Sequence, residues 1–445
     1  METPAEIRER LRAADVSLVA LHFSDMAGMS RVKVIPLRRL ETVARSGTGW
    51  SDIWAVVCID EHFAEVPPYD TPSGDARLIP DLAGAHALPF LPGYAWVPVD
   101  QFSQELEPLP VCPRHVLRLA QDRLQAAGLA AQATYEVEMT LLRDGRPATP
   151  GPGYSVRSFV AIRDFLRDFA AALESVGVPV EQLHPEYSPG QFEVAIAPGT
   201  PLEAADRLLL FRFTARVVAA EHGMDVSFAP VVFTGGLGNG SHLHLSLWRD
   251  DVNRMTGGDA PGRMHADGAS FVAGIRDELP ALMAVVAPSV ASYLRLQPGR
   301  WSGAYTAWGV ENREAALRFI PGTVTSRSRS ANVELKVTDG AANPYLALAA
   351  VLQAGLAGVE REATLPAPTQ EDPGVLDTAT LVARGIRRLP ENLGEAAEAF
   401  AASTVLRDGL GTALHDVIAG VRRKEWADHG EKSEEELVEM HRFAY

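Results

Sequence analysis

Polar and apolar residues alternate along Asn239–Leu247, written NGSHLHLSL, and this alternation predicts a strand. Its polar positions are His242, His244 and Ser246, and leucines stand between and after them. Successive side chains of a strand point to opposite faces, so one face is expected to be buried and the other to present two imidazoles and a hydroxyl. Two such histidines can reach a common ion, although this spacing is more often found in an ordinary half-buried strand.

Three further segments repeat the alternation with carboxylates on the polar face. They are Tyr135–Met139 with Glu136 and Glu138, Gln191–Val194 with Gln191 and Glu193, and Asn332–Val337 with Asn332, Glu334 and Lys336. Glu181, His184 and Glu186 stand just ahead of the second segment. Each segment alone is adequately explained as a half-solvated strand. Together the four strands predict an antiparallel sheet with one polar, concave face.

The rest of the pattern predicts an α+β protein of two domains, residues 1–105 and 106–445. Strands are expected over 17–23, 31–36, 54–59 and 94–99, a short helix over 37–44, and a loop rich in Pro, Gly and Asp over 67–93. Amphipathic or buried helices are expected over 113–127, 156–176, 202–222, 269–292 and 342–360. The smaller first part thus carries mostly strands, and the larger second part alternates helices with the polar-faced strands.

Composition excludes several classes of protein. A hydrophobic content of 47% and a charged content of 22% indicate a globular chain, and a net charge of −16 argues against a nucleic-acid partner. The two cysteines, Cys58 and Cys112, form no CxxC motif, which favours a reducing cytoplasm. The charged N-terminus lacks the apolar core of a signal peptide. The longest uncharged apolar stretch, 279–294, contains two prolines and is too short to span a membrane.

The clustered carboxylates indicate a site for cations, because carboxylates buried together without partners are costly. The group comprises five glutamates and one histidine: Glu136, Glu138, Glu186, Glu193, Glu334 and His242. Oxygen ligands with a single imidazole favour Mg²⁺ or Mn²⁺ over Zn²⁺. Two such ions with water-filled positions are typical of phosphoryl chemistry.

A segment with four arginines supplies the opposite charge. Residues 294–319 carry Arg295, Arg300, Arg313 and Arg318 among aromatic residues and glycines. The guanidinium fork fits carboxylate and phosphate oxygens in pairs. A solvated arginine-rich loop is the alternative, but its aromatic and glycine content is more typical of a loop that lines a site.

Five motifs, taken in their order along the chain, resemble those of the bacterial type of glutamine synthetase over essentially the whole chain. They are the ExE strand at Glu136 and Glu138, the E-x4-E…PGQxE block from Glu181 to Glu193, the HxHxS strand at His242–Ser246, the NRxxxxR segment at Arg313–Arg318, and the ANPYLALAA helix at 342–350. The resemblance implies a small N-terminal β-grasp domain and a larger catalytic domain with a curved antiparallel sheet flanked by helices. It also implies a homo-oligomer of hexameric rings, stacked as a dodecamer, with active sites between neighbouring subunits.

The resemblance also implies roles for individual residues around ATP, glutamate and two to three divalent ions. One ion is expected at Glu138, Glu186 and Glu193, and another at Glu136, His242 and Glu334. ATP is expected to contact Glu181, His244, Ser246 and Arg318, with Arg313 on the transferring phosphoryl group. Arg295, Gly238 and Lys336 are expected to bind the amino-acid substrate. The implied reaction phosphorylates the γ-carboxylate of glutamate, and an amine then displaces the phosphate.

One departure from the family pattern concerns the acceptor amine. Ammonia-using members carry a glutamate on a flap over the site, and Trp301 takes its place in the sequence Pro298-Gly299-Arg300-Trp301. An indole cannot deprotonate ammonium, but it can pack against a larger amine. The family's DGSS-type motif, whose aspartate handles ammonium, is not recognisable, and Asp52 and Asp60 are candidates to replace it.

Other departures concern the acid, the nucleotide and regulation. Leu237 and Gly238 fall where a glutamate-contacting asparagine is expected, so Asn239 could substitute only after a local rearrangement. Lys336 replaces a substrate-binding arginine and keeps the charge without the fork, while Asn332 replaces a basic nucleotide contact. The NLYDLP adenylylation loop is absent, so no such regulation is expected.

Three functions remain open on the sequence. The leading one is an ATP-dependent γ-glutamyl–amine ligase for an organic amine, resembling the family members that use polyamines, ethanolamine, alkylamines or anilines. The others are a glutamine synthetase that uses ammonia, and a non-catalytic family member with a structural or regulatory role. The complete set of metal-ligand positions counts against the last, and an acid other than glutamate also stays open.

Overall fold

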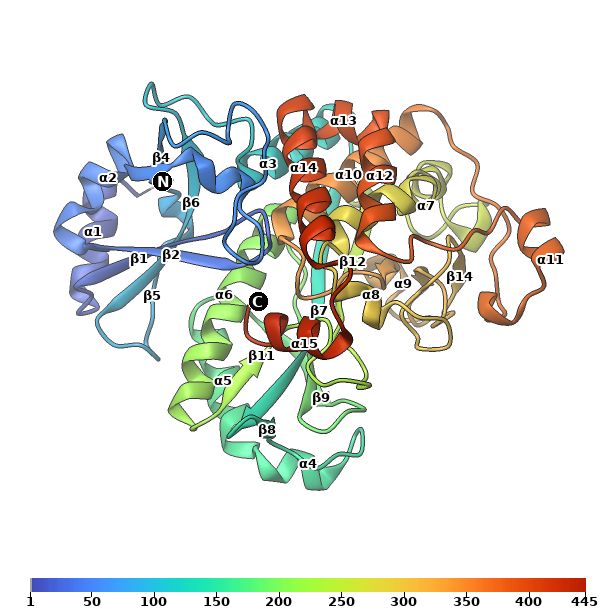
Figure 1. The fold of residues 1–445 in the computed structure, drawn as a ribbon, viewed down its shortest axis with the longest axis horizontal. Coiled ribbons are helices and arrows are strands. Elements are labelled where there is room, and N and C mark those ends of the chain that lie inside the picture. The colour runs from blue at the N-terminus through green and yellow to red at the C-terminus, as the bar shows by residue number, and fades with distance from the viewer. Residues whose placement is uncertain (1) are drawn as a thin grey trace.

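The N-terminal part of the chain forms one sheet in the order β2-β1-β6-β4-β3, with β5 paired to β6. The computed structural model describes residues 2–445. The strands are β1 Leu18–Ser24, β2 Ser30–Pro36, β3 Thr48–Ser51, β4 Asp75–Pro80, β5 His86–Ala87 and β6 Tyr94–Phe102. Helices α1 (Pro4–Ala13) and α2 (Leu40–Ser46) bury their apolar faces against this sheet and form a small separate core. Figure 1 shows this part in blue.

The second sheet runs in the order β14-β15-β16-β12-β7-β10-β9, with β8, β11 and β13 paired at its margins. Its strands are β7 Ala130–Arg143, β8 Arg146–Pro147, β9 Val180–Pro185, β10 Gln191–Ile196, β11 Asp225–Ser227, β12 Ser241–Arg249, β13 Val252–Asn253, β14 Trp308–Val310, β15 Leu317–Ile320 and β16 Asn332–Leu335. All its pairings are antiparallel except β14 with β15. The four polar-faced strands β7, β10, β12 and β16 therefore belong to one sheet, as predicted, and the α+β class is confirmed.

Strand register brings the polar residues of the sheet together. His242 on β12 lies opposite Glu136 on β7, and Glu193 on β10 lies opposite Glu138 on β7. The alternate residues of β7, such as Val137, are buried on the other face. Register and pleat fix which side chains share a face. Burial of the apolar residues on one face therefore places the polar residues together on the other face.

Helices pack against the apolar face and around the sheet (Figure 1). They are α3 Pro113–Ala126, α4 Val156–Ala161, α5 Arg163–Ser175, α6 Pro201–Glu221, α7 Ala266–Val286, α8 Ser292–Arg295, α9 Arg327–Ser330, α10 Pro344–Glu360, α11 Thr378–Ala383, α12 Leu393–Ala402, α13 Thr404–Leu410, α14 Thr412–His429 and α15 Glu434–His441. Helix α10 is buried almost all round, as its sequence predicts, and packs on α7 and α3. Asn343 caps it by accepting hydrogen bonds from the Tyr345 and Leu346 amides. Within residues 2–445, no helix has the length and apolarity needed to cross a membrane.

Two sequence-based predictions in the N-terminal part were wrong. The apolar run 54–59, predicted as a strand, begins instead within a 3₁₀ helix over Asp52–Val56. This run is buried against the larger second part of the chain, where the Glu425 side chain of α14 accepts a hydrogen bond from the Ile59 amide. The run is therefore apolar because it is buried, although it belongs to neither sheet. The segment 67–93, predicted as a loop, contains β4 and β5, and Ala76, Leu78 and Pro80 alternate as buried residues along β4.

Two predicted helices also differ in extent. The helix predicted over 156–176 breaks at Ile162, whose backbone angles of φ −129° and ψ 20° separate α4 from α5. The helix predicted over 269–292 ends at Val286, and a short segment leads from there to α8. Each broken pattern has apolar residues at helical spacing on both sides of the break, so periodicity alone does not reveal it.

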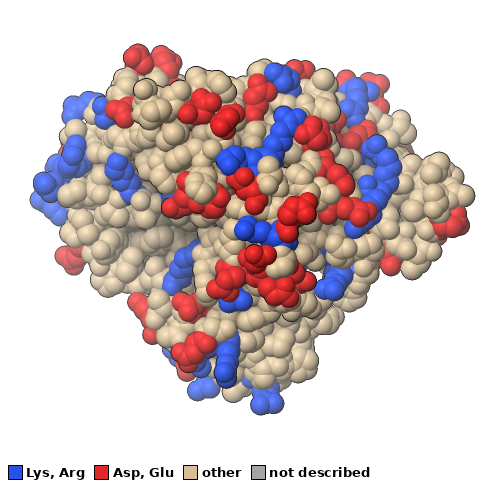
Figure 2. All heavy atoms as spheres, viewed as in Figure 1, with Lys and Arg blue, Asp and Glu red and all other residues tan. Residues whose placement is uncertain are grey.

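On the surface, acidic and basic side chains are interspersed over the face drawn in Figure 2.

His22 on β1 makes the stability of the N-terminal sheet depend on pH. It is buried and accepts a hydrogen bond of 2.7 Å from Trp96 Nε1 on β6. Burial, with the charges of Arg216 and Arg212, lowers its pKa from 6.5 to about 3. Its contribution to stability is therefore complete above pH 6.5 and is lost as the pH falls from 6.5 towards 3, because the unfolded state then binds the extra proton.

We expect His22→Gln to flatten this acid dependence. The glutamine carbonyl can still accept the Trp96 bond but cannot titrate. The wild type should lose roughly 4 kcal/mol more than the variant between pH 7 and pH 3, from 1.36 kcal/mol per pKa unit. Urea unfolding of both proteins across this range checks it, and parallel curves would contradict the assignment.

Candidate active site

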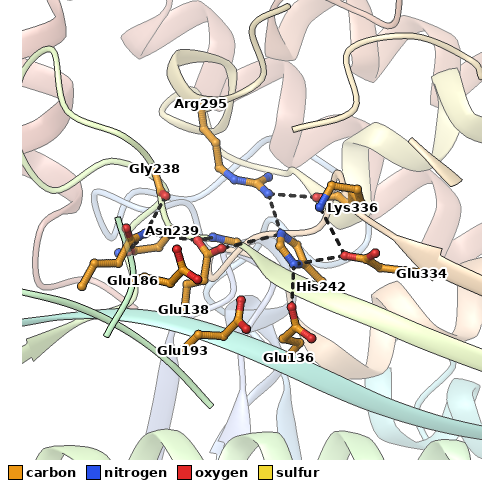
Figure 3. Close-up of polar contacts among 12 residues, drawn as sticks. Glu136, Glu138, Glu186, Glu193, Gly238, Asn239, His242, Arg295, Glu334 and Lys336 are labelled. Carbon is orange, nitrogen blue, oxygen red and sulfur yellow. Dashed lines mark hydrogen bonds and ion pairs between the residues drawn. The ribbon is translucent and has the colours of Figure 1, made fainter. Parts of the chain in front are cut away.

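A cavity of about 430 Å³ opens over the polar face of the second sheet. Ten of the residues singled out in the sequence line it: Glu136, Glu138, Glu186, Glu193, Gly238, His242, Arg295, Trp301, Arg313 and Lys336. Figure 3 shows the carboxylates from the strands grouped around His242, with the Arg295 side chain approaching from α8. The sequence-predicted site thus comes together in space, although the first and last of these residues, Glu136 and Lys336, are 200 positions apart along the chain.

One group of potential metal ligands consists of Glu136, His242 and Glu334. Their ligand atoms all lie within 4.8 Å of one another, with His242 Nδ1 at 3.3 Å from Glu334 Oε1 and 3.6 Å from Glu136 Oε1. His242 Nδ1 is buried and has no hydrogen-bond partner. A buried ring nitrogen left unpaired between two carboxylates fits a cation bound among the three residues.

A second concentration of ligands surrounds Glu193. It forms one group with Glu138 and His242 and another with Glu186 and His184. His184 Nε2 lies 3.0 Å from Glu186 Oε1 and 3.3 Å from Glu193 Oε1. Glu193 therefore joins the three carboxylates expected at one ion, and His184 enters this group as an additional candidate ligand.

The charges of the site are unbalanced without cations. Burial and the neighbouring carboxylates, Glu136 first, raise the pKa of Glu193. Burial also opposes ionisation of Glu334, but Lys336 and His242 outweigh it and lower its pKa to about 2. One carboxylate is thus held charged by its basic neighbours, while another is driven towards neutrality by its acidic ones. Divalent cations would relieve the second effect, so the donor set fits the ions expected from the sequence.

The basic residues lie on the other side of the cavity. Arg295 Nη2 is 3.2 Å from His242 Nε2 and donates a hydrogen bond of 2.9 Å to the Lys336 carbonyl. Lys336 Nζ lies 3.3 Å from Glu334 Oε1, and Arg313 is exposed at the cavity wall. An anion bound in the cavity therefore meets three cationic side chains opposite the carboxylates.

A close approach of backbone and side chains explains the glycines before β12. A Cβ atom on Gly238 would come within 2.7 Å of the Arg295 side chain and closer still to the Pro230 carbonyl. The neighbouring Gly240 amide donates a hydrogen bond of 2.6 Å to Glu138 Oε2. Only glycine leaves Arg295 its position against this turn.

An aromatic wall, which we define as Tyr154, Tyr187 and Trp301, stands at the mouth of the cavity. The Tyr187 and Trp301 rings meet edge to face at 5.8 Å, and Tyr154 meets Tyr187 in the same way at 6.2 Å. Tyr154 also stacks on His184 at 4.7 Å and donates a hydrogen bond of 3.3 Å to Glu186 Oε1. All three rings are about half exposed or more. Cations and alkyl chains both bind such faces.

Sequence reasoning missed the two tyrosines of the aromatic wall. Tyr154 ends a Pro/Gly-rich stretch, TPGPGY, and Tyr187 directly follows Glu186, a candidate metal ligand. An aromatic residue after a glycine-rich loop, or beside a metal ligand, was the available signal.

Glu314, a further residue that the sequence did not reveal, holds the flap that carries Trp301. Trp301 has a positive φ of 54°, and its amide donates a hydrogen bond of 3.0 Å to Glu314 Oε1. Burial raises the pKa of Glu314 most strongly, and the negative charge of Asp372 raises it further. This carboxylate fixes the backbone at a residue whose conformation is unfavourable for a side chain other than glycine.

We expect Glu314→Ala to loosen the flap and raise the KM for the acceptor about tenfold, with a smaller effect on the KM for ATP. The estimate takes the loss of one charge-assisted hydrogen bond at about 1.5 kcal/mol. Glu314→Gln is the matched control, because its carbonyl oxygen can still accept from the Trp301 amide. Steady-state kinetics of both variants check this expectation. Equal KM values for the acceptor in Glu314→Ala and the wild type would contradict it.

The nucleotide-side candidates lie beyond the carboxylate cluster, along β12, β15 and β9. His244 Nδ1 is 3.0 Å from Asn332 Oδ1, and Arg318 donates a hydrogen bond of 3.0 Å to Glu334 Oε2. Ser246 accepts a hydrogen bond from Trp248 Nε1, and Glu181 is exposed near the start of β9. Their contacts with ATP stay a prediction.

Asn239, which the sequence left as a possible contact of the acid substrate, lies in the interior of the protein. Asn239 is buried, and its side chain bonds to Gln191, Thr140 and the Ala229 carbonyl. Leu237 instead lines the cavity, half exposed. The cavity wall therefore has an apolar residue at the position where the sequence analysis expected an asparagine.

Comparisons with known proteins identify the family of this chain. Residues 110–441 match the family model "Glutamine synthetase, catalytic domain", and residues 4–113 match "Glutamine synthetase N-terminal domain". The chain is 45% identical to the gamma-glutamylpolyamine synthetase GlnA3 of Streptomyces coelicolor, over 95% of this chain and 92% of that protein. It is 31% identical to the glutamate–methylamine ligase of Methyloversatilis universalis, over 96% of each chain.

Solved structures give the same result for the fold. A crystal structure of a novel glutamine synthase homolog matches 97% of this chain and 99% of its own, with a TM-score of 0.87 at 32% identity. A complex of GmaS with ADP matches 96% of this chain and 97% of its own, with a TM-score of 0.84 at 29% identity. Because both family models match and together cover nearly the whole chain, the chain belongs to the glutamine synthetase family of ATP-dependent ligases.

Proposed function

We propose that this protein is an ATP-dependent ligase that joins the γ-carboxylate of glutamate to an organic amine. The observation that carries the proposal is Trp301, which stands in the flap at the cavity mouth beside Tyr187. Groups of residues that could hold metal ions lie below it, which supports placing the departure from the ammonia-using pattern on the acceptor side. Similarity to a polyamine ligase at 45% identity, and to a methylamine ligase, supports the same reading.

Two groups of residues would hold the divalent ions, Mg²⁺ or Mn²⁺, together with ATP. Glu136, His242 and Glu334 would hold one ion, and Glu138, Glu186 and Glu193 another, with a third ion possible in the family. Bound there, the ions would neutralise phosphate oxygens during phosphoryl transfer. Glu181, His244, Ser246 and Arg318 would bind the nucleotide.

The cationic residues would orient the acid and stabilise the charge that develops on it. Arg295 and Lys336 would hold the glutamate α-carboxylate, with Gly238 leaving room for the substrate chain. Arg313 would face the phosphoryl group as it passes from ATP to the γ-carboxylate. The product, γ-glutamyl phosphate, is an activated acyl group, and its carbonyl carbon is then attacked by the amine with release of phosphate.

The aromatic wall would select the amine. An alkylammonium group can lie against the faces of Trp301 and Tyr187, while its carbon chain displaces water from the rings. Free ammonia gains little from these faces, because it has no carbon chain to bury. We propose polyamines as the first class to test, since the Streptomyces relative is named for them.

A phosphate-release assay with ATP, glutamate and Mg²⁺ tests the proposal across ammonia, ethanolamine, putrescine, spermine, methylamine and aniline. We expect release that depends on one organic amine, with kcat/KM at least about tenfold above that for ammonia, and a γ-glutamyl amide detected by mass spectrometry. Release with ammonia as the best acceptor would overturn the proposal in favour of a glutamine synthetase. Absence of ATP and Mg²⁺ binding would favour a non-catalytic protein.

The proposal extends to the assembly and the setting of the enzyme. We propose a homo-oligomer of hexameric rings stacked as a dodecamer, a cytoplasmic location, and domains that meet near residue 106. Glutamate, the amine and ATP are then the partners, with no nucleic acid and no membrane.

A further inference from the structure

A cluster of potential metal ligands lies outside the cavity, where the N-terminal part meets α14. Asp60 follows the 3₁₀ helix at 52–56, and Asp428 and His429 end α14. One ligand atom from each of these three residues lies within 4.8 Å of the others. None of the three lines the active-site cavity.

His429 provides an independent sign that the cluster binds a ligand. Its side chain is 7% exposed, and neither ring nitrogen has a hydrogen-bond partner. Nε2 nevertheless lies 3.2 Å from Asp60 Oδ2. A buried imidazole this close to a carboxylate normally makes a hydrogen bond. Here the two atoms are close, but their orientation is not that of a hydrogen bond.

The same arrangement occurs at the active site of this chain. There, His242 Nδ1 is buried and unpaired, at 3.3 Å from Glu334 Oε1. Two atoms that share an ion at about 2.1 Å each lie about 3.0–3.5 Å apart, with both lone pairs directed at the ion. The 3.2 Å separation at His429 fits this geometry as well as the active-site separation does.

Neighbouring residues hold the aspartates in place. His62 donates its amide to Asp60 Oδ1 at 3.1 Å, and its Nδ1 lies 2.9 Å from Asp60 Oδ2. Lys424 Nζ lies 2.5 Å from Asp428 Oδ2, so an ion in the cluster would share or replace that contact. His62 is exposed and can turn its ring to supply a fourth ligand.

We propose that Asp60, Asp428 and His429 form a second metal site, for a divalent transition ion such as Zn²⁺. The set of donors here, two carboxylates with one imidazole and the adjoining His62, is richer in nitrogen than the five glutamates and one imidazole of the cavity, so it suits Zn²⁺ while the cavity favours Mg²⁺ or Mn²⁺. The ion would join the two parts of the chain at the point where Glu425 and Arg422, on the same helix, already bond to the Ile59 amide and the Met26 carbonyl. The site does not depend on the proposed reaction, because none of its three ligands lines the cavity; Asp60, a candidate from the sequence for handling the amine, lies in this cluster instead.

Counting bound Zn²⁺ in the full-length protein tests the proposal. The protein is stripped with a chelator, loaded with Zn²⁺, gel-filtered and analysed by atomic emission. We expect Asp428→Asn and His429→Gln each to hold one Zn²⁺ fewer per chain than the wild type. Asp416→Asn is the matched control, since Asp416 is an exposed aspartate on the same helix that pairs with Arg407. It should retain the wild-type count.

A second comparison separates this ion from those of the active site. Glu334→Gln should lower the count at the cavity, and adding Asp428→Asn to it should remove one further Zn²⁺. Zn²⁺ should raise the Tm of Glu334→Gln by a few degrees more than that of the double variant, because an ion that binds only the folded state stabilises it. Asp428 is exposed, so its variant is expected to fold. Equal counts and equal Tm shifts in the presence and absence of Asp428→Asn would overturn the proposal.

Discussion

Glu334→Ala is expected to lower amine-dependent phosphate release at least about a thousandfold while the oligomer stays intact. Glu334 is buried on β16 and lies beside His242, Lys336 and Arg318 at once. Its loss removes a ligand of the proposed ion and leaves the basic residues without their shared carboxylate. Removing one preorganised charge at a reacting centre commonly costs a hundredfold to a thousandfold, and loss of the ion adds to this.

Phosphate release and gel filtration measure the two parts of this expectation. Glu334→Gln is the matched variant, because it keeps the shape of the side chain and removes only its charge. Both variants should fail in catalysis and elute as the wild type. Full activity in either would mean that Glu334 holds no catalytic ion.

Trp301→Glu is expected to shift the ratio of kcat/KM values about a hundredfold from the organic amine towards ammonia. The substitution removes an aromatic face worth about 1 kcal/mol to a bound ammonium group and introduces a carboxylate that can bind and deprotonate ammonium. The flap itself should stay in place, since Glu314 holds it through the backbone amide of residue 301.

Trp301→Phe controls for the aromatic contribution and should keep the acceptor profile of the wild type. The profile is measured with ammonia and the best organic amine at several concentrations of each. If Trp301→Glu and the wild type have the same profile, the flap residue has no part in choosing the amine.

Much of the site was predictable from the sequence because strand alternation is a strong constraint. Once Val137 and its neighbours on β7 are buried, Glu136 and Glu138 must face the opposite side, and pairing with β12 then sets His242 against Glu136. The order of the motifs added the family, whereas the pairing of the strands came from the structure. The α+β fold follows from the same patterns.

The rest depends on contacts between distant segments, which local patterns do not encode. Residues 54–59 are apolar because they are buried near Glu425. Their sequence therefore resembles that of a buried strand, although the run begins within a 3₁₀ helix. The aromatic wall exists only because the loop of Tyr154 and the flap of Trp301 reach Tyr187 from opposite sides. The bond from Trp301 to Glu314 spans 13 residues and has no sequence signature.

A competition between two acceptors in one reaction tests the central claim most directly. The enzyme receives ATP, glutamate, Mg²⁺ and equal concentrations of ammonia and putrescine, and mass spectrometry measures the ratio of products at low conversion. Ethanolamine, methylamine, spermine and aniline replace putrescine in parallel reactions. The structure predicts that a γ-glutamyl amide of an organic amine exceeds glutamine at least about tenfold in one of them. Glutamine as the main product in every reaction would contradict the assignment of Trp301 and return the protein to glutamine synthesis.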